Sequence, residues 1–175
     1  MWDQQAEYVE VWCEKDAISG ILREVTENWD VPLYVTRGYS SETFLYNAAE
    51  TLKTCGKRAQ IYYFGDLDPS GWNISQKIEE RLREFGAVFN FERVAVHRWQ
   101  VAEWKLPTRP VKRTDTRLRG WGDGACVEID AIPANRLRAL CEQAITRHID
   151  QGALNATRQA ETLERQTLER LAVNL

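Results

Sequence analysis

Residues 61–71 read Ile-Tyr-Tyr-Phe-Gly-Asp-Leu-Asp-Pro-Ser-Gly, and the rest of the chain is organised around this stretch. Its first four residues are apolar or aromatic, which is typical of a buried strand in a parallel sheet. Asp66 and Asp68 follow, and in an extended backbone their side chains leave on the same side. Because neighbouring carboxylates repel each other unless a cation lies between them, this arrangement is typical of a Mg²⁺ site. The alternative is that Asp68 caps a helix beginning at Pro69.

The composition predicts one globular domain. The chain has 175 residues, of which 43% are hydrophobic and 28% charged. It contains no apolar run long enough to cross a membrane and no signal-peptide pattern, so we expect a cytoplasmic protein. Four cysteines without paired spacing argue against zinc and favour buried free thiols. The net charge of -3 argues against a protein that coats nucleic acid through its whole surface, but it is compatible with a local basic patch.

Strand patterns and helix patterns alternate along the chain. Strands are predicted at residues 8–13, 31–36, 61–64, 88–96 and 125–129. Helices are predicted at residues 17–29, from Ser40 or Ser41 towards Gly56, up to a stop at Gly86, after Pro133, and over 157–175. Such alternation predicts an α/β fold, with a parallel, Rossmann-like sheet of about four strands flanked by helices and a C-terminal helical extension. We expect residues 1–150 to form one domain and residues 151–175 a helical tail.

Several polar residues directly follow predicted strands. The carboxyl ends of parallel strands meet at one edge of an open α/β sheet, and ligands bind at that edge. We therefore expect these side chains to lie together and to form a metal site, in preference to a set of unrelated helix caps. They are Glu14, Arg37, Asp66, Asp68, His97 and Arg98.

A basic loop is predicted over residues 99–124. From Lys105 to Arg119 the chain carries six basic residues and one acidic residue, and two prolines discourage regular structure there. A basic loop beside an acidic site can hold a phosphate backbone. The alternative is a solvated loop whose tryptophans pack on the core. The candidate nucleic-acid-binding residues are Lys15, Arg37, Arg98, Lys105, Arg109, Lys112, Arg113 and Arg117.

Four short motifs follow one another along the chain: Glu14-Lys15-Asp16, Arg37-Gly38-Tyr39, Asp66-x-Asp68-Pro-x-Gly71, and Val-Glu-Ile-Asp-Ala-Ile-Pro at 127–133. Together they resemble the Toprim domain of topoisomerases, primases and OLD-type nucleases. They cover residues from about 8 to 150, and their details are most similar to the topoisomerase VI A subunit and its relatives. The resemblance implies that Glu14, Asp66 and Asp68 bind Mg²⁺, with Mn²⁺ as a substitute, and support phosphoryl transfer at a DNA phosphodiester. It also implies that Glu14 is a metal ligand or general acid/base, and that Lys15, Arg37 and the basic loop hold the backbone.

The sequence departs from these relatives at its start. Topoisomerase VI-type proteins carry a helical DNA-binding domain with the attacking tyrosine ahead of the Toprim domain, whereas the first predicted strand here begins near Tyr8. We therefore expect either a stand-alone Toprim protein or a fragment whose partner supplies that domain. Covalent strand passage by this chain alone is not expected.

Three functions remain open at this point. The first is a Mg²⁺-dependent nuclease or DNA-processing enzyme that uses metal-activated water. The second is a non-catalytic module that binds metal and DNA within a larger complex. The third is a small-phosphate enzyme or receiver-like phosphoacceptor, since an acidic edge on a parallel sheet also suits those folds. DNA is the expected partner, RNA is an alternative, and a homodimer is compatible with the polar helical tail.

Overall fold

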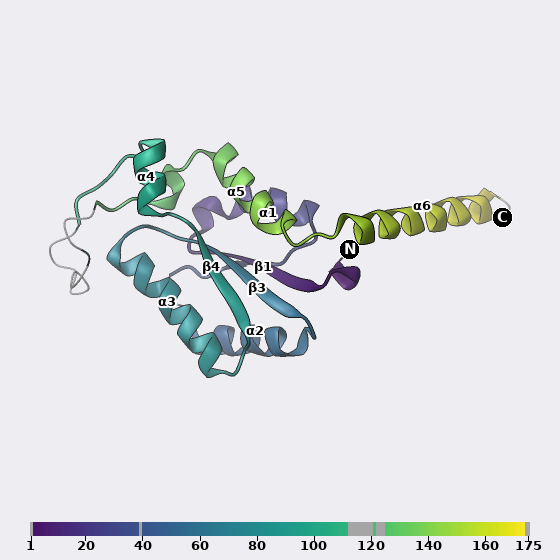
Figure 1. Cartoon of the computed structure of the whole chain (residues 1–175), viewed down its shortest axis with the longest axis horizontal. Helices are drawn as coiled ribbons and strands as arrows, with labels where there is room; N and C mark the ends of the chain where they lie inside the picture. The colour runs from purple at the N-terminus through teal and green to yellow at the C-terminus, as the bar shows by residue number, and fades with distance from the viewer. Residues whose placement is uncertain (1, 39, 112–120, 122–124, 174–175) are drawn as a thin grey trace.

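Four parallel strands form the central sheet, in the order β2-β1-β3-β4 (Figure 1). The computed structural model describes residues 2–38, 40–111, 121 and 125–173. β1 and β3 pair along their whole length, from Glu7 opposite Arg58 to Cys13 opposite Phe64. The predicted α/β fold with a four-stranded parallel sheet is therefore confirmed. The strands are β1 (Glu7–Cys13), β2 (Leu33–Val35), β3 (Arg58–Phe64) and β4 (Phe89–Ala95).

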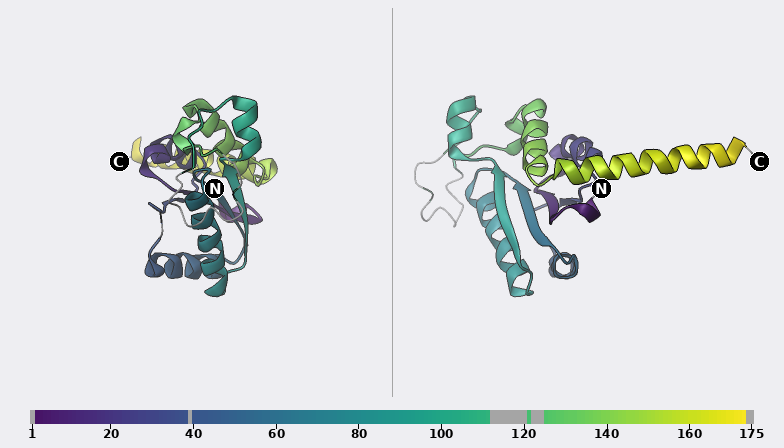
Figure 2. Two further views of the ribbon diagram at one scale, coloured as in Figure 1. Left: turned by 90° about the vertical axis from the view of Figure 1, so that its left-hand side faces the viewer. Right: turned by 45° about the vertical axis from the view of Figure 1, so that its right-hand side comes forward.

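Helices cover both faces of the sheet (Figures 1 and 2). Because successive strand residues point to opposite faces, β1 contributes to two cores. Val9 and Val11 pack on the side of α1 (Asp16–Asn28) and α5 (Ala134–Thr146). Trp12 packs on the other side, against α2 and α3. These two helices span Glu42–Thr54 and Pro69–Glu84.

The helix ends follow from local sequence. The Ser41 side chain accepts a hydrogen bond from the N–H of Phe44 and caps α2, as one of the two predicted serines. Asp68 caps α3, and Pro69 is the first helical residue. Asp16 is the first residue of α1, and Lys15 occupies the N-cap position of that helix. A short 3₁₀ helix, η1 (Trp2–Gln4), precedes β1.

The predicted fifth strand at residues 125–129 is wrong for the described part of the chain. Single antiparallel bridges join Cys126 to Arg109 and Val127 to Leu67. The chain then turns into a 3₁₀ helix, η2 (Ile129–Ala131), and continues into α5. Leu67 and Arg109 both lie outside the strands, so each bridge pairs two loop residues and does not extend the sheet. The predicted basic loop also begins with a short helix, α4 (Arg98–Trp104), which ends before the two prolines.

The C-terminal helix α6 (Gln151–Val173) extends away from the body of the molecule (Figures 1 and 2). Leu154 is its one buried residue among those described, whereas Leu163, Leu168 and Leu171 are 59–66% exposed. The predicted helical tail is confirmed, with its start at Gln151. No helix in the described ranges is both long and apolar enough to span a bilayer.

Candidate functional site

Two of the three predicted metal ligands meet at the carboxyl edge of the sheet. Glu14 directly follows β1, and Asp66 lies two residues beyond β3. Oε2 of Glu14 accepts a hydrogen bond from the backbone N–H of Asp66 at 3.0 Å. The backbone N–H of Glu14 donates in turn to the carbonyl of Phe64 at 2.9 Å. Parallel pairing of β1 with β3 therefore brings together two residues that lie 52 positions apart.

Two glycines make room for the Glu14 carboxylate. A Cβ atom added to Gly65 would lie 2.7 Å from Glu14 Oε2 and 2.5 Å from Cε1 of Tyr63. A Cβ atom on Gly71 would lie 2.7 Å from the Asp66 carbonyl oxygen and 3.0 Å from Glu14 Oε2. A side chain at either position would displace the carboxylate. We call Gly65 and Gly71 the glycine cradle.

The carboxyl groups around the glycine cradle have perturbed pKa values. Burial, together with the nearby carboxylates of Asp66 and Asp68, raises the pKa of Glu14 to about 7. Burial also raises the pKa of Asp66, although the N–H of Ile129 and the Lys15 ammonium act in the opposite direction. Because burial, and to a smaller extent the neighbouring carboxylates, disfavour the ionised form of these groups, a divalent cation bound here would stabilise that form.

Asp68 has the structural role that the sequence left open as the alternative. Its Oδ1 accepts the N–H of Gly71 at 2.6 Å and caps α3. The side chain nevertheless lies close enough to raise the pKa of both Glu14 and Asp66. In the described ranges, no three His, Cys, Asp or Glu side chains are already arranged as a metal-binding group. The carboxylate oxygens of Glu14, Asp66 and Asp68 are hard donors that suit Mg²⁺, and these side chains would have to rearrange to bind it together.

Lys15 places a cation among these carboxylates. Its Nζ atom lies 3.0 Å from Oδ2 of Asp66, 3.4 Å from Oε2 of Glu128 and 3.7 Å from Oδ1 of Asp130. Burial alone would lower the pKa of Lys15, but its ion pair with Asp66 raises the pKa above the usual value. Lys15 therefore neutralises Asp66 from the side of η2.

Arg93 is a site residue that sequence reasoning missed. It lies in β4 and donates hydrogen bonds to the carbonyls of Asp66 and Gly71 and, at 2.9 Å, to Oγ of Ser75. Its guanidinium also lies 5.3 Å from the ring centroid of Trp72. We call residues 65–68, between β3 and α3, the acidic loop; Arg93 thus fixes the backbone of this loop and of the start of α3. The available signal was a lone arginine inside an otherwise strand-forming segment.

Two of the predicted phosphate-binding residues lie beside the carboxylates. Arg37 pairs with Asp16 at 2.8 Å, and both line a cavity of about 310 Å³ together with Glu14, Lys15 and Gly38. Arg109 pairs with Glu128, which also binds Lys15. The structure therefore gathers Lys15, Arg37 and Arg109 around the acidic residues.

The other predicted basic residues are more distant from the carboxylates or not described. Arg98 donates to the Trp121 carbonyl at 3.0 Å and packs over its ring. Lys105 ends α4 in the left-handed conformation. His97 precedes α4, with Nε2 placed 2.6 Å from the carbonyl of Arg93. Lys112, Arg113 and Arg117 lie outside the described residues, as does Tyr39 of the Arg-Gly-Tyr motif.

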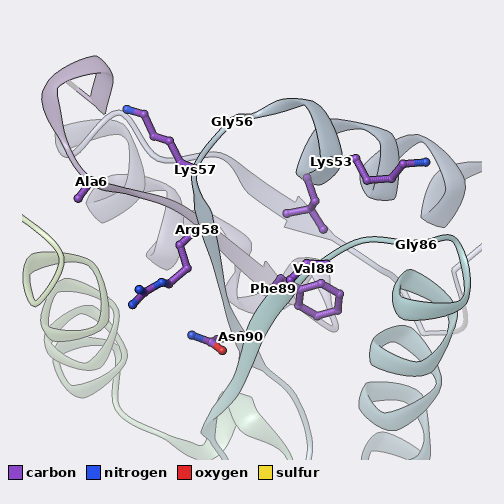
Figure 3. A pocket seen from close by; sticks show the side chains of 10 residues that line it. Ala6, Lys53, Gly56, Lys57, Arg58, Gly86, Val88, Phe89 and Asn90 are labelled. Atoms are coloured by element: carbon purple, nitrogen blue, oxygen red, sulfur yellow. The ribbon is translucent and has the colours of Figure 1, made fainter.

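A larger cavity, of about 940 Å³, lies at the opposite edge of the sheet, where β3 and β4 begin (Figure 3). Lys53 and Lys57 are among its lining residues. Lys53 Nζ pairs with Glu50 at 2.6 Å, and Lys57 Nζ donates to the carbonyls of Trp2 and Asp3. Because both ammonium groups already have partners within the fold, we assign no function to this cavity.

The fold and the site together define an α/β protein with a parallel sheet and an acidic, lysine-containing site at its carboxyl edge. No model of a known protein family matches the chain, and no curated protein matches its sequence.

Proposed function

We propose that this protein is a Toprim-like enzyme that processes nucleic-acid phosphodiesters with Mg²⁺ or Mn²⁺. The observation that carries the proposal is the meeting of Glu14 and Asp66 in the glycine cradle at the carboxyl edge of the sheet. These two residues belong to different motifs, and the order of those motifs along the chain supports the Toprim resemblance.

The chain supplies hard oxygen ligands and an acid/base group. Glu14 and Asp66 would hold the metal, with Asp68 as a third ligand after rotation. When bound, the metal would stabilise negative charge on the phosphate and on the leaving oxygen. In the alternative role, with the metal held by the aspartates, Glu14 would be the acid/base group, and its pKa, raised to about 7 by burial and neighbouring carboxylates, suits proton transfer near neutral pH.

Water is the nucleophile in this proposal. Tyr62 and Tyr63, in β3, are the tyrosines nearest in sequence to Asp66, but both side chains are buried in the core. Burial raises the pKa of Tyr62 to about 12, which disfavours the phenolate that would attack phosphorus. Arg37 and Arg109, whose side chains are each 73% exposed, would bind the phosphate backbone.

The experiment compares Glu14→Gln and Asp66→Asn with the wild type. Both variants should lose Mn²⁺ binding and Mg²⁺-dependent cleavage of DNA while retaining the circular dichroism spectrum of the folded protein. Glu80→Gln is the matched control, since Glu80 is exposed on α3 and should retain both activities. Cleavage of DNA at the wild-type rate by both Glu14→Gln and Asp66→Asn would contradict the proposal.

A second candidate is a non-catalytic module that binds metal and nucleic acid for a larger complex. Two observations favour it: Asp68 caps α3, and Asp66 is already paired with Lys15. This candidate predicts tight, salt-dependent DNA binding with no turnover in either Mg²⁺ or Mn²⁺. Measurement of binding and cleavage on the same preparation separates the two candidates.

A further inference from the structure

Lys15 already supplies to Asp66 the positive charge that a bound metal ion would supply. Its ammonium group carries three N–H donors and no acceptor. It lies within 4 Å of three carboxylates, from Asp66, Glu128 and Asp130, which come from two separate parts of the chain. The side chain is 26% exposed, so it reaches the site from the solvent boundary.

Both carboxylate oxygens of Asp66 are engaged. Oδ1 accepts the backbone N–H of Ile129 at 2.8 Å, and Oδ2 pairs with Lys15 at 3.0 Å. The N–H belongs to η2, whereas the ammonium is carried by a long side chain with several rotatable bonds. A divalent cation that binds Oδ2 of Asp66 must therefore displace the Lys15 ammonium, because the two positive charges would share one oxygen atom and repel each other.

We propose that Lys15 is a built-in counter-ion that occupies the Asp66 side of the metal site and passes to Glu128 and Asp130 when the metal binds. This inference rests on the metal site proposed above. The displaced ammonium keeps two of its three present partners, which limits the cost of moving it. Lys15 is thus a positioning residue that sets metal affinity.

Arg109 connects this exchange to the nucleic acid. Its guanidinium pairs with Oε1 of Glu128, while Lys15 lies at Oε2 of the same carboxylate. Two backbone hydrogen bonds of 2.8 Å between Arg109 and Cys126 hold the two segments together. A phosphate that binds Arg109 removes its positive charge from Glu128. Glu128 then attracts the Lys15 ammonium more strongly, and this favours the movement of Lys15 away from Asp66. Metal and nucleic acid therefore strengthen each other's binding, as linkage requires.

The first test is calorimetric titration of the full chain with Mn²⁺. Lys15→Met should bind Mn²⁺ on the order of tenfold more tightly than the wild type, because the competing charge is gone. Lys77→Met removes the same charge from an exposed position on α3 and should leave the affinity unchanged. Equal or weaker binding by folded Lys15→Met overturns the inference and leaves the metal site standing. Absence of Mn²⁺ binding in all three proteins overturns both.

A second variant keeps Lys15 in place. Glu128→Gln removes the charge that receives the displaced ammonium, so it should weaken Mn²⁺ binding several-fold; unchanged or tighter binding contradicts the exchange. In the double variant with Lys15→Met, the Glu128→Gln change should have no further effect. A further loss in the double variant would mean that Glu128 is itself a metal ligand and would overturn the exchange.

The third test measures Mn²⁺ affinity with and without a short DNA duplex. The duplex should tighten Mn²⁺ binding several-fold in the wild type and leave Arg109→Gln unaffected. An equal effect of DNA on both proteins would contradict the role of Arg109.

Discussion

Glu10, within β1, and Glu14, directly after it, show how differently one residue type behaves. Glu10 is fully buried and accepts hydrogen bonds from the Tyr8 hydroxyl at 3.0 Å and from Trp12 Nε1 at 2.7 Å. Burial raises its pKa to about 7, and these hydrogen bonds oppose the rise. Burial raises the pKa of Glu14 to a similar value, but there neighbouring carboxylates add to the rise. Glu10 is therefore a core residue, and Glu14 belongs to a site that attracts cations.

The first prediction concerns the pH dependence of stability. The pKa of Glu10 lies near 7 in the folded protein, above its ordinary value of 4.5. Its contribution to stability is therefore fully present below pH 4.5 and is lost as the pH rises through 7. Glu10→Gln should remove up to about 3 kcal/mol of the decrease in unfolding free energy between pH 4.5 and pH 8. Urea denaturation at both pH values measures this, with Glu80→Gln as control; an unchanged difference in Glu10→Gln would contradict the burial assignment.

The second prediction tests the glycine cradle. Gly71→Ala forces a methyl group against the Asp66 carbonyl and the Glu14 carboxylate. It should destabilise the protein by about 1–3 kcal/mol and weaken Mn²⁺ binding. Gly20→Ala is the matched control, because a Cβ at this exposed position in α1 meets nothing within 4 Å. Gly20→Ala should stabilise the protein by about 0.5–1 kcal/mol in the same thermal denaturation experiment. Similar effects of the two changes would remove the argument for the cradle.

At the scale of the element, the beginning of α3 combines a structural and a chemical role. Asp68 caps the helix through one carboxylate oxygen, and its charge acts on Glu14 and Asp66. The same residue type satisfies both requirements, which is why the two interpretations of Asp-x-Asp could not be separated from sequence. Substitutions can separate them, because Asn caps a helix about as well as Asp but carries no charge.

The third prediction follows from that difference. Asp68→Asn should keep the stability of the wild type within about 0.5 kcal/mol, whereas Asp68→Ala should lose about 1 kcal/mol. Both should weaken Mn²⁺ binding if Asp68 contributes a ligand. Ser41→Ala, which removes the cap of α2 away from the site, should lose stability alone. Wild-type Mn²⁺ affinity in Asp68→Asn would leave Asp68 with the capping role only.

At the scale of the whole molecule, the site and the C-terminal helix belong to different regions. The carboxyl edge of the sheet carries the acidic residues, while α6 projects from the body with one buried residue, Leu154, among those described (Figures 1 and 2). The α5–α6 junction is held by Gln5, which exchanges hydrogen bonds with the backbone of Asp150. The stability of the body should therefore depend on this junction and not on the remainder of α6.

The fourth prediction separates the junction from the projecting helix. Removal of residues 157–175 should change the unfolding free energy of the body by less than about 1 kcal/mol, because it exposes little apolar surface. Leu154→Ala should cost about 2–4 kcal/mol, as expected for a buried leucine. Chemical denaturation of both proteins provides the comparison. A large loss on truncation would show that α6 has a partner that stabilises it in solution.

The sequence by itself determined the alternation of strands and helices, the parallel sheet and the placement of Glu14, Arg37 and Asp66 after successive strands. These features depend on local propensity and on side-chain periodicity, which the chain carries in short windows. The tertiary structure alone decided the strand order, the support of the acidic loop by Arg93 and the pairing of Lys15 with Glu128, 113 residues away. It also replaced the predicted fifth strand with two single bridges. The physical reason is that the partner of a charge or of a backbone N–H is whichever group folds against it, and local sequence holds no record of that distant group.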